Sequence, residues 1–137
     1  MKNPQSSGAE RIKSERLRQM TDEGYDAGHD LTHASGELND AAICYAKAAA
    51  KQARGESHAY LKLMVEAGEV RWPWEDEWWK PSADQIRNLE KAGALIAAEI
   101  DRLLNLQGLR PVNPEAEQEH HIPPVKRNRV DHDAGRY

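Results

Sequence analysis

The sequence of 137 residues has no phenylalanine, only one cysteine and no long apolar run, and these absences exclude several classes of protein. One cysteine cannot form an intramolecular disulfide, and it is too few for a zinc ribbon or knuckle. No segment approaches the roughly eighteen consecutive apolar residues of a membrane-spanning helix. The N-terminus, MKNPQSSGAERIK, lacks the apolar centre of a secretory signal. We therefore expect a cytoplasmic protein that does not enter the membrane.

An excess of positive charge is also missing. The formal net charge is -4, and the sequence pI is about 5.9. A protein that coats nucleic acid needs a broad positive field, so we do not expect nucleic acid as a partner. The single cysteine, Cys44, is expected to be a small buried apolar residue.

What the sequence does contain is helical periodicity. Apolar residues recur at i, i+3 and i+4, and no segment alternates with period two over about five residues, which favours an all-α helical bundle. We expect helices over residues 9–22, residues 28–52, a short segment from Ser57, and residues 82–107. A chain with so few helices cannot cover all of its apolar surface, so we expect a homo-oligomer to complete the bundle.

The helical region is expected to span residues 9–109, after a flexible N-terminus of residues 1–8. Residues 110–137 combine several prolines with mixed charge and little apolar content. Such a composition buries too little surface to offset the entropy of ordering the chain. We expect a disordered or extended tail.

The last expected helix carries the most regular apolar stripe. Its members are Ile86, Leu89, Gly93, Ile96, Ile100, Leu103 and Leu104. We expect this stripe to face the core, and we expect Ser82 to cap the N-terminus of the helix. Small residues around Gly93 should permit close approach of the alanine-rich segment 28–52.

Segment 28–52 carries polar residues beside its own apolar stripe. The apolar residues expected in the core are Leu31, Ala34, Leu38, Ala41, Tyr45 and Ala48. The polar residues Asp30, His33, Glu37, Asp40 and Cys44 fall within about 80° of one another on a continuous helix. Carboxylate oxygens suit hard divalent cations, so this spacing predicts a cation site. The alternatives are a solvated helix face and, for Asp26 or Asp30, an N-cap role.

All four tryptophans lie within eight residues, in the segment RWPWEDEWWKP. Proline and clustered acids predict a loop there. We expect the indoles to wedge this loop against the bundle, because they bury a large area. The alternative is that a nucleotide base stacks on Trp78 or Trp79 while Lys80 meets a phosphate.

The first helix carries a basic face formed by Arg11, Arg16 and Arg18 with Lys13. We expect this face to be solvated. The alternative is that an arginine such as Arg16 reaches a phosphate.

The segments HDLTHASGELNDAAICYA, WPWEDEWWKP and IRNLEKAGALIAAEIDRL together resemble short helical proteins of phage and prophage genomes that are related to the MazG-like nucleotide pyrophosphohydrolases. The resemblance covers residues 19–104. It implies an all-α fold, assembly as a dimer or tetramer, and Mg²⁺ held by an ExxE pair and an ExxD pair. Glu37 and Asp40 match an acidic pair, whereas His33 stands where the enzymes carry an earlier glutamate and Glu90 stands alone where an ExxD pair is expected.

This resemblance and the spacing together predict a Mg²⁺-dependent nucleotide-binding protein similar to enzymes that cleave nucleoside triphosphates between the α and β phosphates. The expected metal ligands are Asp30, Glu37, Asp40 and Glu90, the expected catalytic residues are Glu37 and His33, and the expected nucleotide contacts are Lys80, Trp78, Trp79 and Arg16. The alternatives are a non-catalytic protein that binds or sequesters a nucleotide, and a helical adaptor whose partner is a protein.

Overall fold

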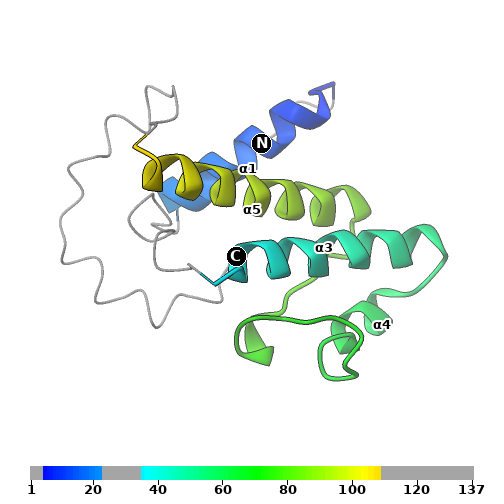
Figure 1. The fold of residues 1–137 in the computed structure, drawn as a ribbon. Helices are drawn as coiled ribbons and strands as arrows, with labels where there is room; N and C mark the ends of the chain where they lie inside the picture. Colours follow the sequence, from blue (N-terminus) through cyan, green and yellow to red (C-terminus); the bar gives the residue numbers. More distant parts are fainter. Residues whose placement is uncertain (1–4, 23–34, 109–137) are drawn as a thin grey trace.

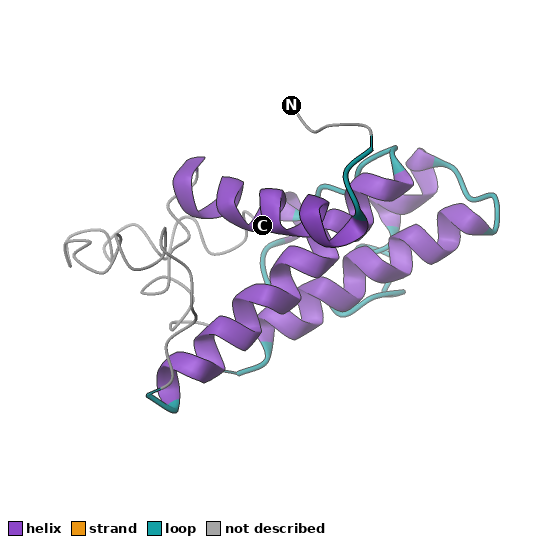
Figure 2. Ribbon diagram, turned by 90° about the horizontal axis from the view of Figure 1, so that it is seen from above, coloured by secondary structure: helices purple, strands orange, loops and turns teal. Residues whose placement is uncertain are grey.

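The structure, a computed structural model, describes residues 5–22 and 35–108. Within these ranges the chain forms helices and loops and contains no strand (Figure 2). The elements are α1 (Gly8–Asp22), α3 (Glu37–Ala53), α4 (His58–Leu63), the short 3₁₀-helix η1 (Asp76–Trp78) and α5 (Gln85–Leu106). The all-α expectation is confirmed. The expected tail, residues 110–137, lies outside the described residues.

Helix α3 lies at the centre of the fold (Figure 1). Helix α5 lies along one side, and α4 lies on the other side with residues 71–81, which we call the tryptophan loop. The Gln85 amide donates to the carbonyl of Ala49 at 3.1 Å, and the Asn88 amide donates to Gln52 Oε1 at 2.9 Å. The start of α5 therefore lies beside the end of α3, and the two helices are antiparallel. Helix α1 packs on α5 and does not form a comparable interface with α3.

The core forms where α3 packs against α5 on one side and against α4 and the tryptophan loop on the other. Leu38, Ala41, Tyr45 and Ala48 are fully buried, as their spacing predicts. Small residues of α5, Ala92, Ala94 and Ala98, are also buried, and Ala92 and Ala98 belong to the same apolar cluster as the alanines of α3. Small side chains on both helices allow their backbones to approach closely, as expected from the two alanine-rich segments.

Helix α3 begins later than the periodicity suggests. Gly36 has a left-handed φ of +89°, which glycine adopts without a steric penalty, and the helix starts at the next residue, Glu37. The expected helix from residue 28 is therefore wrong at residues 35 and 36. Asp30 and His33 lie outside the described residues, and the helix that carries Glu37 does not include residue 35 or 36.

The N-cap of α5 also differs from the expectation. Asp84, not Ser82, occupies the cap position, and its Oδ1 accepts a hydrogen bond from the backbone N–H of Ile86 at 3.0 Å. Ser82 Oγ instead accepts from the backbone N–H of Asp84 at 2.9 Å. Both residue types cap helices well, so composition alone cannot decide between neighbouring candidates.

The apolar stripe expected in the core lies instead on the surface of α5. Five of its large members are between 41% and 54% exposed: Ile86, Leu89, Ile96, Ile100 and Leu103. Leu104, the other large member, is half-buried. The buried positions of α5 include Asn88, Glu90, Glu99 and Arg102. These polar side chains have hydrogen-bond or ion-pair partners, which removes most of the cost of burying them. The expectation that the apolar stripe of α5 faces the core is therefore wrong.

The tryptophan loop packs against α3, as expected. Trp79 is 7% exposed, its indole N–H donates to the carbonyl of Leu61 at 2.8 Å, and its ring lies 4.9 Å from the ring of Tyr45. Trp72 meets both rings edge-on or nearly so. The indoles thus hold the loop on the bundle. Along residues 5–22 and 35–108, no helix has the length and apolar content needed to cross a membrane.

Candidate functional site

Glu37 and Asp40, which we call the acidic pair, lie in the first turn of α3 and are both half-buried. Residues three apart on a helix share a side, so the two carboxylates can approach one ligand. Glu37 Oε1 accepts a hydrogen bond from the backbone N–H of Ser35 at 2.8 Å. The positive end of the helix dipole also stabilises both negative charges. Glu37 thus stabilises the turn before α3, and the two carboxylates lie close enough on one side of the helix to contact the same cation.

An apolar wall adjoins the acidic pair. Leu38 and Ala41 are fully buried, and Cys44, one turn beyond Asp40, is 1% exposed. Burial, followed by the negative charge of Asp40, raises the pKa of the Cys44 thiol to about 12. A protonated thiol is a poor metal ligand. Cys44 is therefore a core residue, as expected, and it forms part of the buried apolar surface next to the acidic pair.

Helix α3 begins near the end of α5 (Figure 1), and two arginines form ion pairs with carboxylates in the last turns of α5. Arg102 forms two hydrogen bonds with the carboxylate of Glu99, at 2.7 and 2.8 Å. Arg16 is 6% exposed and pairs with Asp101 at 3.2 Å. The expectation of a solvated basic face is thus wrong for Arg16, which joins α1 to α5.

Glu90 does not meet the acidic pair. Its carboxylate lies between α1 and α5, where Oε2 is 3.4 Å from Arg11 and Oε1 is 3.3 Å from Arg87. The antiparallel pairing places the acidic pair beside the last turns of α5, and Glu90 lies in its first turns. About ten helical residues, or about 15 Å along the axis, separate these positions. The structure gives Glu90 an interhelical ion pair.

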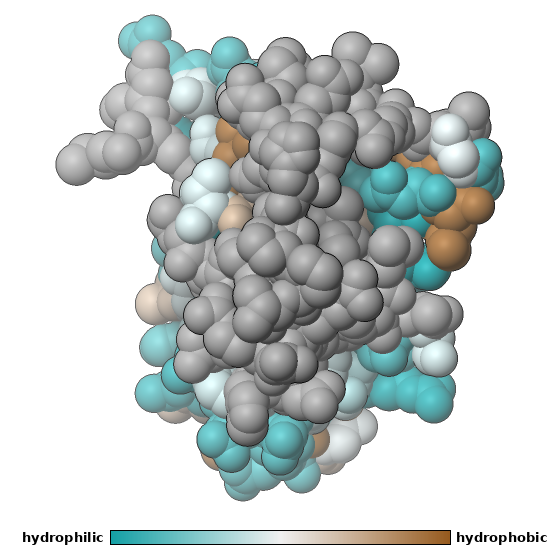
Figure 3. Space-filling view, turned by 90° about the vertical axis from the view of Figure 1, so that its left-hand side faces the viewer, coloured by the Kyte–Doolittle hydropathy of each residue, from teal (hydrophilic) through white to brown (hydrophobic). Residues whose placement is uncertain are grey.

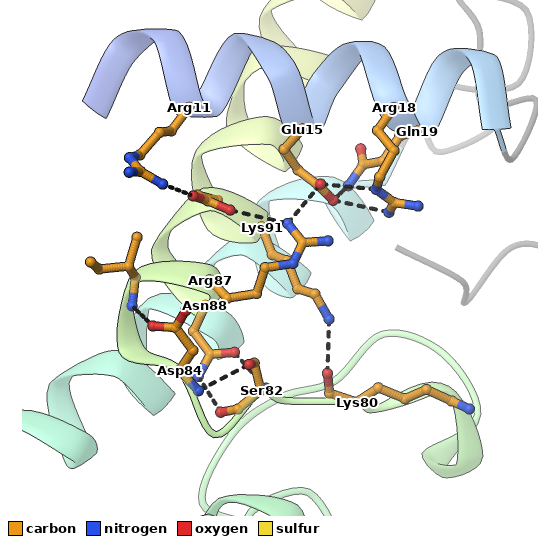
Figure 4. A network of polar contacts seen from close by, with 12 residues as sticks. Arg11, Glu15, Arg18, Gln19, Lys80, Ser82, Asp84, Arg87, Asn88 and Lys91 are labelled. Atoms are coloured by element: carbon orange, nitrogen blue, oxygen red, sulfur yellow. Dashed lines mark hydrogen bonds and ion pairs between the residues drawn. The ribbon is translucent and has the colours of Figure 1, made fainter. Parts of the chain in front are cut away.

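A charged cluster centred on Glu15 was not anticipated from the sequence. The Glu15 side chain is completely buried and accepts hydrogen bonds from Arg18 at 2.9 and 3.0 Å, from Gln19 at 3.1 Å and from Arg87 at 2.6 Å (Figure 4). Burial raises the pKa of Glu15, but hydrogen bonds and charge from Arg18 and Arg87 together lower it below its ordinary value. The i, i+3 and i, i+4 spacing of Glu15 with Arg18 and Gln19 was the available signal.

The remaining expected nucleotide contacts lie in the loop on the opposite side of α3 from α1. The Lys80 side chain is exposed, and its backbone carbonyl accepts a hydrogen bond from Lys91 Nζ at 3.0 Å. Trp78 is half-buried in η1. Trp79 packs against other aromatic rings in the core. This loop is separate from the acidic pair.

Across residues 5–22 and 35–108, no three acidic, histidine or cysteine side chains gather closely enough to hold a metal ion. Of the four expected metal ligands, the described residues bring only Glu37 and Asp40 together. Asp30 and His33, the other expected ligands near this end of α3, lie outside those ranges.

No protein-family model matches the chain, and neither a curated protein nor a solved structure matches it. Function is therefore inferred from the residues and their geometry.

Proposed function

We propose that this protein binds a nucleotide together with Mg²⁺ at the start of α3, with Glu37 and Asp40 as ligands. The observation that supports this best is the placement of two half-buried carboxylates about one turn apart, next to the buried apolar residues Leu38, Ala41 and Cys44. Mg²⁺ is usually held by one or two protein carboxylates, with phosphate oxygens and water completing its coordination. The acidic pair meets that requirement without a third protein ligand.

From the sequence alone, we propose Asp30 as a further metal ligand and His33 as a ligand or a general base. Glu90 and Arg16 are not retained, because each is engaged in an ion pair between α1 and α5. If the bound nucleotide is hydrolysed, Mg²⁺ would neutralise charge on the phosphates and activate a water for attack at the α phosphorus. The expected products are a nucleoside monophosphate and pyrophosphate.

The test compares the parent chain with Glu37→Gln by calorimetric titration of nucleoside triphosphates in Mg²⁺. Glutamine retains an oxygen that can accept from the Ser35 N–H, so the substitution removes the charge and keeps the local turn. We expect binding to weaken at least about tenfold, the effect of roughly 1.4 kcal/mol. The matched control is Glu66→Gln, an exposed glutamate after α4, which should bind like the parent.

Equal binding by the parent and by Glu37→Gln would contradict the proposed site, and so would a parent chain that binds no nucleotide. Pyrophosphate release by the parent chain would identify an enzyme. Binding without release would identify a nucleotide-binding protein without this activity. A second candidate function, a helical interaction protein, is favoured by the exposed apolar stripe of α5.

A further inference from the structure

Arg87 of α5 differs from Arg18 and Arg102 in the part of its guanidinium that it uses. Arg18 contacts Glu15, and Arg102 contacts Glu99, in each case through Nε and Nη2. The N–H bonds on this edge of a guanidinium are parallel, so they match two oxygens of one carboxylate or phosphate. Arg87 instead makes its contacts through Nη1 alone.

The Nε and Nη2 side of Arg87, which we call the open edge, forms no hydrogen bond with residues 5–22 or 35–108. The Nη1 atom lies 2.6 Å from Glu15 Oε1 and 3.3 Å from Glu90 Oε1, and both glutamates are buried. These two contacts hold the guanidinium in place, while the Arg87 side chain remains 27% exposed. An arginine fixed in this way loses little further side-chain entropy when it binds an anion.

The charges around Arg87 also favour an anion. The polar network of Figure 4 joins α1, α5 and the end of the tryptophan loop. Together with Glu90 it has five basic side chains, Arg11, Arg18, Lys80, Arg87 and Lys91, and three acidic ones, Glu15, Asp84 and Glu90. This local excess of two positive charges contrasts with the net charge of -4 on the whole chain. It matches a phosphate monoester, whose charge is about -1.5 to -2 at pH 7.

Lys91 contributes one of these charges on the same side of α5 as Arg87. Lys91 lies one turn after Arg87, and residues four apart on a helix share a side. Its Nζ donates to the carbonyl of Lys80 at 3.0 Å and lies 5.2 Å from the centre of the Tyr45 ring. The tryptophan loop and the aromatic core thus hold the ammonium group about one helical turn from Arg87.

Exposed charge alone does not mark a binding site on this protein, because most of the described side chains visible in Figure 3 are hydrophilic. Arg87 is distinguished by a fixed guanidinium, an open edge and a local excess of positive charge. We propose that Arg87 is the centre of a second ligand site, which binds the phosphate group of a small phosphate monoester without Mg²⁺. Its Nε and Nη2 donate to two phosphate oxygens, and Arg18 and Lys91 add positive charge.

This phosphate site is separate from the acidic pair. Arg87 lies in the first turn of α5, whereas the acidic pair lies beside the last turns of that helix. The two sites can therefore be tested independently, and the phosphate site does not depend on the proposed binding of nucleotide with Mg²⁺.

The test is calorimetric titration of the full-length chain with inorganic phosphate, in EDTA and at constant ionic strength. The parent should bind phosphate, and Arg87→Lys should bind it at least about tenfold more weakly. Lysine keeps a positive charge beside Glu15 and Glu90 but cannot present two parallel donors. Circular dichroism checks that Arg87→Lys retains its helix content. The matched control is Arg71→Lys, which changes an exposed arginine of the tryptophan loop and should bind phosphate like the parent.

Nuclear magnetic resonance of the parent provides a second readout that needs no variant. The ¹H–¹⁵N resonance of Arg87 Nε should shift as phosphate is added, whereas that of Arg71 Nε should not. A parent that binds no phosphate, an unshifted Arg87 resonance, or equal binding by Arg87→Lys would overturn the proposal. Equal affinity for acetate and phosphate would overturn the assignment to phosphate.

Glu37→Gln separates this proposal from the one for the acidic pair. This variant lacks a proposed Mg²⁺ ligand, and in EDTA it should bind inorganic phosphate like the parent. Loss of phosphate binding in Glu37→Gln would show that the two sites are not separate. Absence of Mg²⁺-dependent nucleotide binding in the parent would leave the phosphate titration in EDTA unchanged.

Discussion

Replacing Glu15 with glutamine is expected to reveal how strongly charge joins α1 to α5. The substitution keeps the size of the side chain and removes the charge that accepts hydrogen bonds from Arg18 and Arg87. Breaking a fully buried ion pair costs about 3–5 kcal/mol. The side chains of Arg18 and Arg87 are 36% and 27% exposed, so they recover part of their hydration. We therefore expect a loss of about 2–3 kcal/mol.

For a helical region of this size, such a loss lowers the melting temperature by about 10–20 °C. Thermal unfolding followed by circular dichroism measures the change, with Glu66→Gln as the control for an exposed glutamate, expected to shift stability by less than about 0.5 kcal/mol. A fall of less than about 2 °C for Glu15→Gln would show that the Glu15 cluster contributes little.

The same pair of proteins gives a pH dependence with a defined sign. The pKa of Glu15 is lowered in the folded chain from its ordinary value of 4.5, so its stabilising contribution is fully present above that pH. The contribution is lost as the pH falls through the lowered pKa, and glutamine does not titrate. The difference in melting temperature between the parent and Glu15→Gln should therefore be constant near neutral pH and should shrink below pH 4.5. A difference that grows in acid would refute this assignment.

Three further predictions concern packing, reactivity and the tail. Gly93→Ala introduces a Cβ that overlaps Ile12, and we expect a strain of about 1–3 kcal/mol, more than the helix-propensity gain of about 1 kcal/mol. In an Ile12→Ala background the same substitution should stabilise the protein. Thermal unfolding of the parent, the two single variants and the double variant measures both effects. The buried Cys44 thiol, with its pKa raised to about 12, should react with a thiol reagent at pH 8 only after urea is added, and rapid reaction of the folded chain would contradict its burial. Truncation after Arg110 should leave the melting temperature nearly unchanged, because the removed residues contain little apolar surface; a fall of several degrees would show that they dock.

Helical periodicity predicts much of this fold, because burial along α3 follows a single apolar face. Leu38, Tyr45 and Ala48 are buried as their spacing requires, and Ser57 caps α4 through a hydrogen bond from the backbone N–H of Tyr60 at 3.1 Å. Periodicity fails where one glycine changes the backbone. Gly36 fits a helical pattern in sequence, and its left-handed conformation is visible only in the structure.

The α5 face was assigned wrongly for a different physical reason. Apolar content identifies a surface that avoids water, but it does not say whether the same chain or another covers it. Glu99 and Arg102 are buried because each satisfies the other, and their spacing of three residues is also common on exposed helix faces. Their burial is a property of the packed bundle, which the spacing of individual residues does not reveal.

The candidate site was predictable only in part. The acidic pair follows from spacing alone, because three residues on a helix bring two side chains to one side. The position of Glu90 depends on the antiparallel register of α3 and α5 and on the docking of α1. Such long-range pairing is a property of the packed structure, so a ligand set drawn from separate helices cannot be fixed by local patterns.

The attachment of α1 also bears on the order in which the protein opens. Its ion pairs join residues far apart in the sequence, as in Arg11 with Glu90, Glu15 with Arg87 and Arg16 with Asp101. Helices α3 and α5 instead share one apolar cluster, to which Trp79 of the tryptophan loop also belongs. Partly exposed ion pairs weaken with salt, whereas an apolar core does not depend on them. The backbone amides of α1 should therefore exchange with solvent through openings that leave α3 and α5 paired, and added salt should make these openings more frequent.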